Sequence, residues 1–333
     1  MASQAPLRVG LVGAGSIAQV AELPSLAARS DVQLVGLVSR DPERANANLR
    51  RWPIDRAYPS IESMLDEARL DALVVLTPKH DHTRFVRAGL EAGIDVFCEK
   101  PLASSLDEAR AMAQLAEDRN RILMVGFNRR YAETYVRARE QFAAEPPRFV
   151  VAQKNRAGSE YRATLENAIH MIDLLRWFCG EAVDITAHAI ADDPYAEDGL
   201  AALIRFDSGS VGVLLAARCA GEWDERLEAY GGQTTVRVMA PDSVAIAKDG
   251  ATEVVKLRPR ALGWQQATVA LGFSAEIDHF IECVAERRQP LTHGQDAVLT
   301  QELTEQVIRA AGLPTTDRET VSARATSEQE SAP

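Results

Sequence analysis

The sequence predicts an α/β protein of two domains, the first built on a parallel sheet and the second on a mostly antiparallel sheet. In the first half of the chain, short apolar runs alternate with helical patterns, which is typical of a parallel sheet covered on both faces. In the second half, strand-like runs follow one another closely and are joined by turn signals. The length of 333 residues suits two cores at roughly 100–200 residues per domain.

The apolar runs of the first half are the predicted strands, and the amphipathic segments between them are the predicted helices. Asp41 stands before Pro42 and predicts a further helix start, because aspartate caps free amides and proline suits a first turn. The strands are expected at 7–12, 32–38, 72–76, 94–98 and 123–127, and the other helices at 16–28, 61–67, 83–91 and 106–117.

The second half begins after Pro146-Pro147, a pair that interrupts a helix. We therefore place the first domain at 1–146 and the second at 147–312, and we expect the polar segment 313–333 to be a disordered tail. Strands are expected at 149–154, 183–190, 200–206, 210–217, 225–230 and 234–239, and helices at 165–179, 273–287 and 296–310.

Composition narrows the classes of partner. The net charge of −11 disfavours nucleic acid and anionic membranes. No apolar run approaches the ~20 residues that cross a bilayer, and residues 1–6 lack a signal-peptide pattern, so we expect a cytoplasmic protein. Four widely spaced cysteines predict reduced, buried thiols and no metal site.

A glycine-rich loop, Gly13-Ala14-Gly15-Ser16-Ile17-Ala18, follows the first predicted strand and opens the first predicted helix. In that context Gly13 turns the chain, Gly15 lets backbone amides approach a pyrophosphate, and Ser16 and Ile17 begin the helix whose amino end favours the anion. The loop predicts dinucleotide binding; the alternative is a tight turn that binds no nucleotide.

The end of the second strand indicates which dinucleotide is bound. An acidic residue there usually holds the ribose 2′-hydroxyl of NAD, but this chain has Ser39 followed by Arg40. A hydroxyl and a guanidinium suit a 2′-phosphate, so we expect NADP(H) in preference to NAD(H). The alternative is that Arg40 is a solvated charge and that Asp41 takes the ribose position.

Two further groups have the chemistry of a catalytic site. Glu99-Lys100-Pro101 follows a predicted strand at the sheet edge where open α/β sheets bind ligands, so Lys100 is placed to stabilise a negative oxygen. Glu166 and His170 are four residues apart, on one face of a predicted helix, where a carboxylate orients an imidazole. The alternatives are a solvated lysine and a histidine of the core.

Several motifs in this order resemble the glucose-fructose oxidoreductase / inositol dehydrogenase (Gfo/Idh/MocA) family, over about residues 7–312. Besides the glycine loop, Thr77-Pro78-Lys79-His80-Asp81-His82 is similar to its T-P-N-x-x-H turn and Glu99-Lys100-Pro101 to its E-K-P. Gly126-Phe127-Asn128-Arg129-Arg130-Tyr131 resembles its G-F-N-R-R stretch, and Ile169-His170-Met171-Ile172-Asp173 resembles its I-H-x-I-D helix.

The resemblance implies a Rossmann domain followed by an α/β domain whose large, mostly antiparallel sheet commonly packs on another subunit, hence a homodimer or homotetramer. It assigns Lys100 to the nicotinamide and the substrate and makes His170 the acid/base, with Glu166 where the family has aspartate. We expect further cofactor contacts from Thr77, Pro78, His82 and Glu99, and substrate contacts from Arg130 and Asn155; the alternative for Arg130 is an ion pair at the surface. Tyr161 and Trp264 are candidates to stack on a sugar, although buried packing is the default for such residues.

The expected activity is NADP(H)-dependent hydride transfer at a hydroxyl or keto carbon of a sugar, a sugar derivative or a cyclic polyol. The alternatives are a non-catalytic nucleotide or sugar sensor on the same scaffold and a reductase of a non-sugar substrate. The chain departs from the family pattern at Lys79, which replaces asparagine, and at Glu22, which replaces an aromatic residue or histidine on the first helix.

Overall fold

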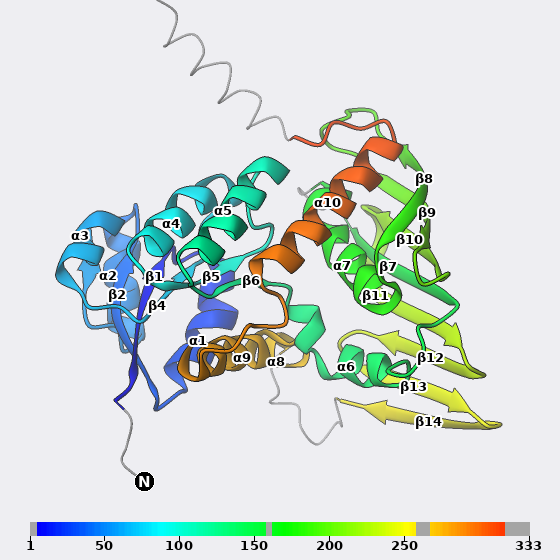
Figure 1. Cartoon of the computed structure of the whole chain (residues 1–333), viewed down its shortest axis with the longest axis horizontal. Coiled ribbons are helices and arrows are strands. Elements are labelled where there is room, and N and C mark those ends of the chain that lie inside the picture. The colour runs from blue at the N-terminus through cyan, green and yellow to red at the C-terminus, as the bar shows by residue number, and fades with distance from the viewer. Residues whose placement is uncertain (1–4, 158–161, 258–266, 317–333) are drawn as a thin grey trace, which may run out of the picture. The chain divides into compact units, whose positions relative to one another are not determined.

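The computed structural model describes residues 5–157, 162–257 and 267–316, and the chain divides into two compact units (Figure 1). The first unit comprises residues up to Asn128 together with Gly272–Leu299, and the second comprises Arg129–Leu271 and the residues from Thr300 onward. This division differs from the predicted boundary after residue 146. The predicted tail is described only to residue 316, and 317–333 lie outside the described residues.

Residues Gly272–Leu299 join the first unit through side-chain contacts with its amino-terminal part. The Ser25 and Ser274 hydroxyls are 2.9 Å apart, and the Phe97 and Phe280 rings are 5.7 Å apart between centroids. A segment distant in sequence thus completes the core beneath the first sheet, and hydrophobic periodicity alone does not indicate which sheet such a helix covers.

The sheet of the first unit has six strands in the order β3-β2-β1-β4-β5-β6, and every pair is parallel. This order is that of a Rossmann fold, in which the strand order reverses between β1 and β4 and ligands bind at the carboxyl edge. The predicted parallel sheet is confirmed. The strands are β1 (Leu7–Val12), β2 (Val32–Val38), β3 (Ala57–Tyr58), β4 (Ala72–Val75), β5 (Asp95–Glu99) and β6 (Leu123–Gly126).

Helices cover both faces of this sheet, with α4 and α5 on one side and α1 and α9 on the other (Figure 1). The predicted cap at Asp41 is confirmed, because its carboxylate accepts hydrogen bonds from the amides of Glu43 and Arg44 at 2.9 and 3.1 Å. The helices are α1 (Leu23–Ala27), α2 (Pro42–Arg51), α3 (Ile61–Glu67), α4 (Lys79–Glu91), α5 (Leu106–Asp118) and α9 (Phe273–Glu286), while α10 (Gly294–Ala310) is divided between the units at Leu299.

The sheet of the second unit has eight strands in the order β14-β13-β12-β11-β7-β10-β9-β8, and of its pairs only β7 with β10 is parallel. The mostly antiparallel sheet is therefore confirmed. The strands are β7 (Phe149–Ala157), β8 (Ala182–Ile190), β9 (Gly199–Phe206), β10 (Val211–Ala217), β11 (Cys219–Gly231), β12 (Thr234–Met239), β13 (Ser243–Lys248) and β14 (Ala251–Lys256).

The hairpin of β13 and β14 was not predicted from the sequence. Its turn is Asp249-Gly250, and both residues have positive φ, at 52° and 77°. Asp-Gly is a strong signal for such a turn, since it tolerates this backbone conformation. The turn signal was therefore present, and β13 contains the apolar run 244–247, whereas β14 interrupts its apolar residues with Thr252 and Glu253.

Helices cover one face of the eight-stranded sheet (Figure 1). Along β9 the residues Leu200, Ile204 and Phe206 are buried on that face, whereas Leu203 between them is 51% exposed. No described helix thus covers the opposite face of this sheet. The helices of this unit are α6 (Glu133–Glu140), α7 (Ile169–Cys179), α8 (Ala267–Ala270) and the later part of α10, whose Leu303 and Val307 join the core.

The structure bears on two predictions made from composition, the state of the cysteines and the membrane-spanning segments. All four cysteines are free thiols, but Cys219 is exposed at the start of β11, so burial of every thiol was wrong. Among the described helices, none combines the length and the apolar character that a membrane span requires.

A buried ionic cluster joins three elements of the second unit at Glu225 of β11. Arg129 donates two hydrogen bonds of 2.8 Å to its carboxylate, Lys154 of β7 lies 3.0 Å from it, and the Tyr135 hydroxyl of α6 donates at 2.9 Å. Burial alone raises the pKa of Glu225, but the charges of Arg129 and Lys154 outweigh burial and hold the pKa well below its usual range.

Replacing Glu225 by glutamine is expected to lower the free energy of unfolding by about 3–5 kcal/mol, because two buried cations lose their counter-charge. Chemical denaturation measures the loss, with the exposed Glu222→Gln on the same strand as control. Because the folded-state pKa of Glu225 is depressed, its contribution is present above its unfolded pKa of about 4.3 and is lost as pH falls below that value. Equal stability of the wild type and Glu225→Gln at neutral pH contradicts this role.

Candidate active site

The glycine loop connects β1 to the first helical segment at the carboxyl edge of the first sheet. Gly13 has φ +93°, and a Cβ there would lie 2.7 Å from the Leu76 carbonyl oxygen, so a side chain is excluded. A Cβ on Gly15 would meet nothing within 4 Å, and Ser16 and Ile17 are exposed. The open space at Gly15 fits a pyrophosphate approaching the backbone amides.

The end of β2 carries the residues expected to distinguish the two dinucleotides. The Arg40 side chain is 78% exposed, with Nη1 3.7 Å from an oxygen of Asp81. The Asp41 carboxylate instead accepts the first amides of α2, and the Asp41 amide donates to the Ser39 hydroxyl at 3.3 Å. Asp41 is thus engaged as a helix cap, which argues against its placement at a ribose.

His82 joins two loops at the carboxyl edge. It is 1% exposed, and its Nδ1 and Nε2 lie 2.7 and 2.8 Å from the carbonyl oxygens of Pro101 and Thr77. Burial lowers its pKa, against the opposing effect of these two carbonyls, and a neutral imidazole donates to only one of them. Both ring nitrogens thus face protein carbonyls, and the cofactor contact expected of His82 stays a prediction.

The Glu99-Lys100-Pro101 turn lies at the end of β5, as predicted. The Lys100 amide donates to Oε2 of Glu99 at 3.1 Å, and a Cβ on Gly126 of β6 would lie 3.4 Å from the same oxygen. Glu99 and Lys100 are half-buried, and the nearby loop after β4 presents Thr77 and Pro78. The turn therefore combines a carboxylate and an ammonium at the edge where this fold binds ligands.

His170 and Glu166 lie in the second unit, on a helix that differs from the predicted one. Residues Ala163–Ala168 form a π-helix, and α7 begins at Ile169. His170 is 7% exposed and Glu166 is half-buried. The wider π turn changes the angle between side chains four residues apart, so the expected α-helical geometry of this pair was wrong. Single π turns within helices are rare overall, but those that occur are often found at functional sites.

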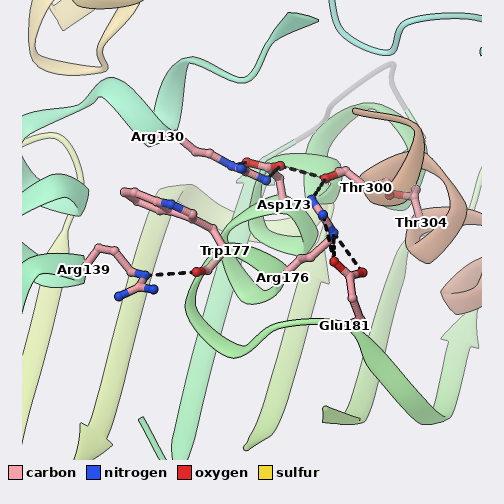
Figure 2. Close-up of polar contacts among 8 residues, drawn as sticks. All are labelled: Arg130, Arg139, Asp173, Arg176, Trp177, Glu181, Thr300 and Thr304. Carbon is pink, nitrogen blue, oxygen red and sulfur yellow. Dashed lines mark hydrogen bonds and ion pairs between the residues drawn. The ribbon is translucent and has the colours of Figure 1, made fainter. Parts of the chain in front are cut away.

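Arg130 is engaged within the protein by a buried carboxylate, and its contact with substrate stays a prediction. It is 3% exposed and donates from Nε and Nη2 to Asp173 at 2.8 and 2.6 Å (Figure 2). The Thr300 hydroxyl donates to the same carboxylate at 2.8 Å, and Arg176 pairs with Glu181 nearby (Figure 2). Asp173 therefore links η2, the 3-10 helix of Asn128–Tyr131, to α10 through Arg130 and Thr300.

Asn155 has a similar role at the end of β7. The side-chain Oδ1 of Asn155 accepts a hydrogen bond from the Ala217 amide at 3.1 Å, and the side-chain Nδ2 lies 3.4 Å from Oδ2 of Asp224. The side chain is 8% exposed and joins β7 to both neighbouring strands, and its role in substrate binding stays a prediction. The two aromatic residues proposed to stack on a sugar, Tyr161 and Trp264, lie outside the described residues.

Two family models match the chain. The model described as an oxidoreductase family with an NAD-binding Rossmann fold matches residues 7–127, and the GFO/IDH/MocA C-terminal domain matches residues 134–237. The chain belongs to the Gfo/Idh/MocA family. The resemblance inferred from the sequence motifs is therefore confirmed.

Relatives in this family match along nearly the whole chain. An inositol 2-dehydrogenase of Rhizobium meliloti is 26% identical and covers 91% of this chain and 96% of its own length. An oxidoreductase of Salmonella typhimurium, YceM, is 29% identical and covers 92% and 98%. The crystal structure of a dehydrogenase from Chromobacterium violaceum has a TM-score of 0.83, with 21% identity over 98% of this chain and 99% of that one, and supports the fold.

Glu22 departs from the Gfo/Idh/MocA pattern, and the sequence alone assigns no role to this residue. It is the last residue of a π-helix, Ala18–Glu22, which replaces the first part of the predicted helix 16–28. Its side chain is wholly buried, and Glu99 lies beside it. The available signal was a glutamate at an apolar position of the first helix, since unpaired carboxylates are seldom buried.

Proposed function

We propose that this chain is an NADP(H)-preferring dehydrogenase or reductase acting on a hydroxyl or keto carbon of a sugar, a sugar derivative or a cyclic polyol. The observation that carries the proposal is the Glu99-Lys100 turn at the carboxyl edge of a Rossmann sheet whose glycine loop has room for a pyrophosphate. Relatives support the substrate class: one is named scyllo-inositol 2-dehydrogenase (NAD+) and another D-xylose 1-dehydrogenase (NADP+).

Each candidate residue has a distinct task in this proposal. Bound nicotinamide accepts or supplies the hydride. The Lys100 ammonium stabilises negative charge on the substrate oxygen, and the His170 imidazole takes the hydroxyl proton in oxidation and returns it in reduction. Glu166 orients that imidazole or the substrate. The roles of Lys100, His170 and Glu166 are those that the family resemblance assigns.

Lys100→Met and His170→Asn are each expected to lower turnover by about 10²–10⁴-fold, because each removes the group that manages charge or proton at the reacting oxygen. NADPH affinity should change much less. The measurement is steady-state NADP+ reduction with myo-inositol, scyllo-inositol and D-xylose, with the exposed Lys256→Met and His188→Asn as matched controls.

Near-normal turnover of Lys100→Met and His170→Asn would remove both assignments. Binding of NADPH by the wild type without turnover of any polyol or ketosugar would favour the sensing regulator. Turnover confined to imines or other non-sugar carbonyl compounds would favour the alternative reductase.

The proposed preference for NADP(H) rests on the end of β2. Arg40 is exposed there beside the Ser39 hydroxyl, and the neighbouring acid, Asp41, is occupied at the start of α2. An exposed guanidinium next to a hydroxyl can bind a dianionic 2′-phosphate, whereas no carboxylate is presented to a ribose 2′-hydroxyl. One relative is named for NADP+ and another for NAD+, so the proposed cofactor preference depends on Ser39, Arg40 and Asp41 of this chain.

Arg40→Ala is expected to weaken NADPH binding by roughly tenfold or more while leaving NADH binding unchanged, because it removes a charge-assisted hydrogen bond. Ser39→Asp should reverse the preference, since a carboxylate repels the phosphate and accepts from the ribose. Fluorescence titrations with both cofactors measure the effect, with Arg50→Ala, an exposed arginine at the other end of α2, as control. Tighter binding of NADH than NADPH by the wild type contradicts the proposal.

We also propose a homodimer or homotetramer formed through the uncovered face of the eight-stranded sheet. Leu203 of β9 pairs with Val213 of β10, which pairs in turn with Val151 of β7, and all three point to this face. Phe149 and Leu215 on the same face are 55% and 38% exposed. A contiguous apolar surface of this kind favours association.

Leu203→Arg is expected to shift the wild-type oligomer toward monomer, because it places a charge at the centre of the apolar face. Light scattering after size exclusion measures the mass, and Leu291→Arg, at a 40% exposed position of the first unit, is the control. A monomeric wild type at micromolar concentration would overturn the assembly proposal and leave the enzymatic one intact.

A further inference from the structure

Glu22 is buried where an ionised carboxylate is costly. Its relative exposure is 0%, and no other described residue donates a hydrogen bond to either carboxylate oxygen. Burying an unpaired carboxylate is so unfavourable that such a group normally takes up a proton instead. Burial therefore favours the protonated, neutral form of the Glu22 side chain.

The polar neighbour of Glu22 is the carboxyl group of Glu99. Two ionised carboxylates are both acceptors, so a hydrogen bond between them exists only when one carries a proton. Burial first, and then the charge of Glu99 together with a hydrogen bond to it, raise the pKa of Glu22 to about 10, while the backbone amide of Glu22 lowers it in part. The proton thus belongs on Glu22 at neutral pH.

The Glu99 carboxylate has a fixed place that a second hydrogen bond can maintain. Its Oε2 accepts the Lys100 amide at 3.1 Å, and its carboxyl lies against the backbone of Gly126, where an added Cβ would be 3.4 Å away. Helix α9 packs against the π-helix that ends at Glu22, and it contributes a further buried acid, Glu276, in its first turn.

We propose that Glu22 is a neutral carboxylic acid that donates a hydrogen bond to Glu99 and so positions the Glu99-Lys100 turn. It is a positioning residue, because it acts on cofactor and substrate through Glu99 and Lys100. The protonation of Glu22 stands on the structure of the first unit alone, whereas its use in catalysis rests on the proposed function.

Infrared spectroscopy of the cofactor-free protein tests the protonation directly. The wild type minus Glu22→Gln difference spectrum at neutral pH is expected to contain the C=O band of a protonated carboxylic acid. The band should be lost as pH rises through about 10. Glu43→Gln, which changes an exposed glutamate of α2, should remove no such band. A spectrum without the band at neutral pH overturns the proposal.

NADPH titration tests the positioning. Glu22→Gln keeps a neutral donor and should bind NADPH within about twofold of the wild type, whereas Glu22→Leu fills the space without a donor and should bind roughly tenfold more weakly. Glu22→Met is the second apolar variant if leucine prevents cooperative unfolding. Equal affinities of the glutamine and apolar variants overturn the positioning role. Failure of the wild type to bind either cofactor, with the infrared band present, would instead remove the proposed function.

Discussion

A charge withdrawn from water must meet an opposite charge or be neutralised, and this constraint shapes both units of the chain. Glu225 meets it with Arg129 and Lys154, and Asp173 meets it with Arg130. Among the described residues, Glu22 pairs with no cation; its neighbour is another acid, so it retains its proton. Buried acids of the same chemistry thus take opposite charge states according to what they face.

The same constraint applies to the two arginines of the G-F-N-R-R stretch. Each places its guanidinium in a two-point contact with a buried carboxylate, Arg129 with Glu225 and Arg130 with Asp173. A guanidinium held in this way is already neutralised and is removed from solvent. The two arginines of the motif therefore connect the start of the second unit to β11 and α7.

The sequence predicted the parts of the fold that depend on hydrophobic periodicity and turn chemistry. The parallel sheet, the antiparallel sheet and the cap at Asp41 follow from local patterns and are confirmed. The π-helix at Ala18–Glu22 and the return of α9 to the first unit depend on tertiary packing, which no short window of sequence encodes. For the same reason the roles of Arg130 and Asn155 became evident only once their partners were known.

The two cations proposed to act on ligands differ from the buried arginines in what the fold does with them. Arg40 stands at the end of β2 with most of its side chain in solvent, and Lys100 follows β5 half-buried, its position set by the backbone of the turn. At the carboxyl edge, the parallel sheet ends and leaves side chains without a neighbouring strand to pack against. The distribution of positive charge between core and edge therefore separates the residues that hold the fold from those available to a cofactor and a substrate.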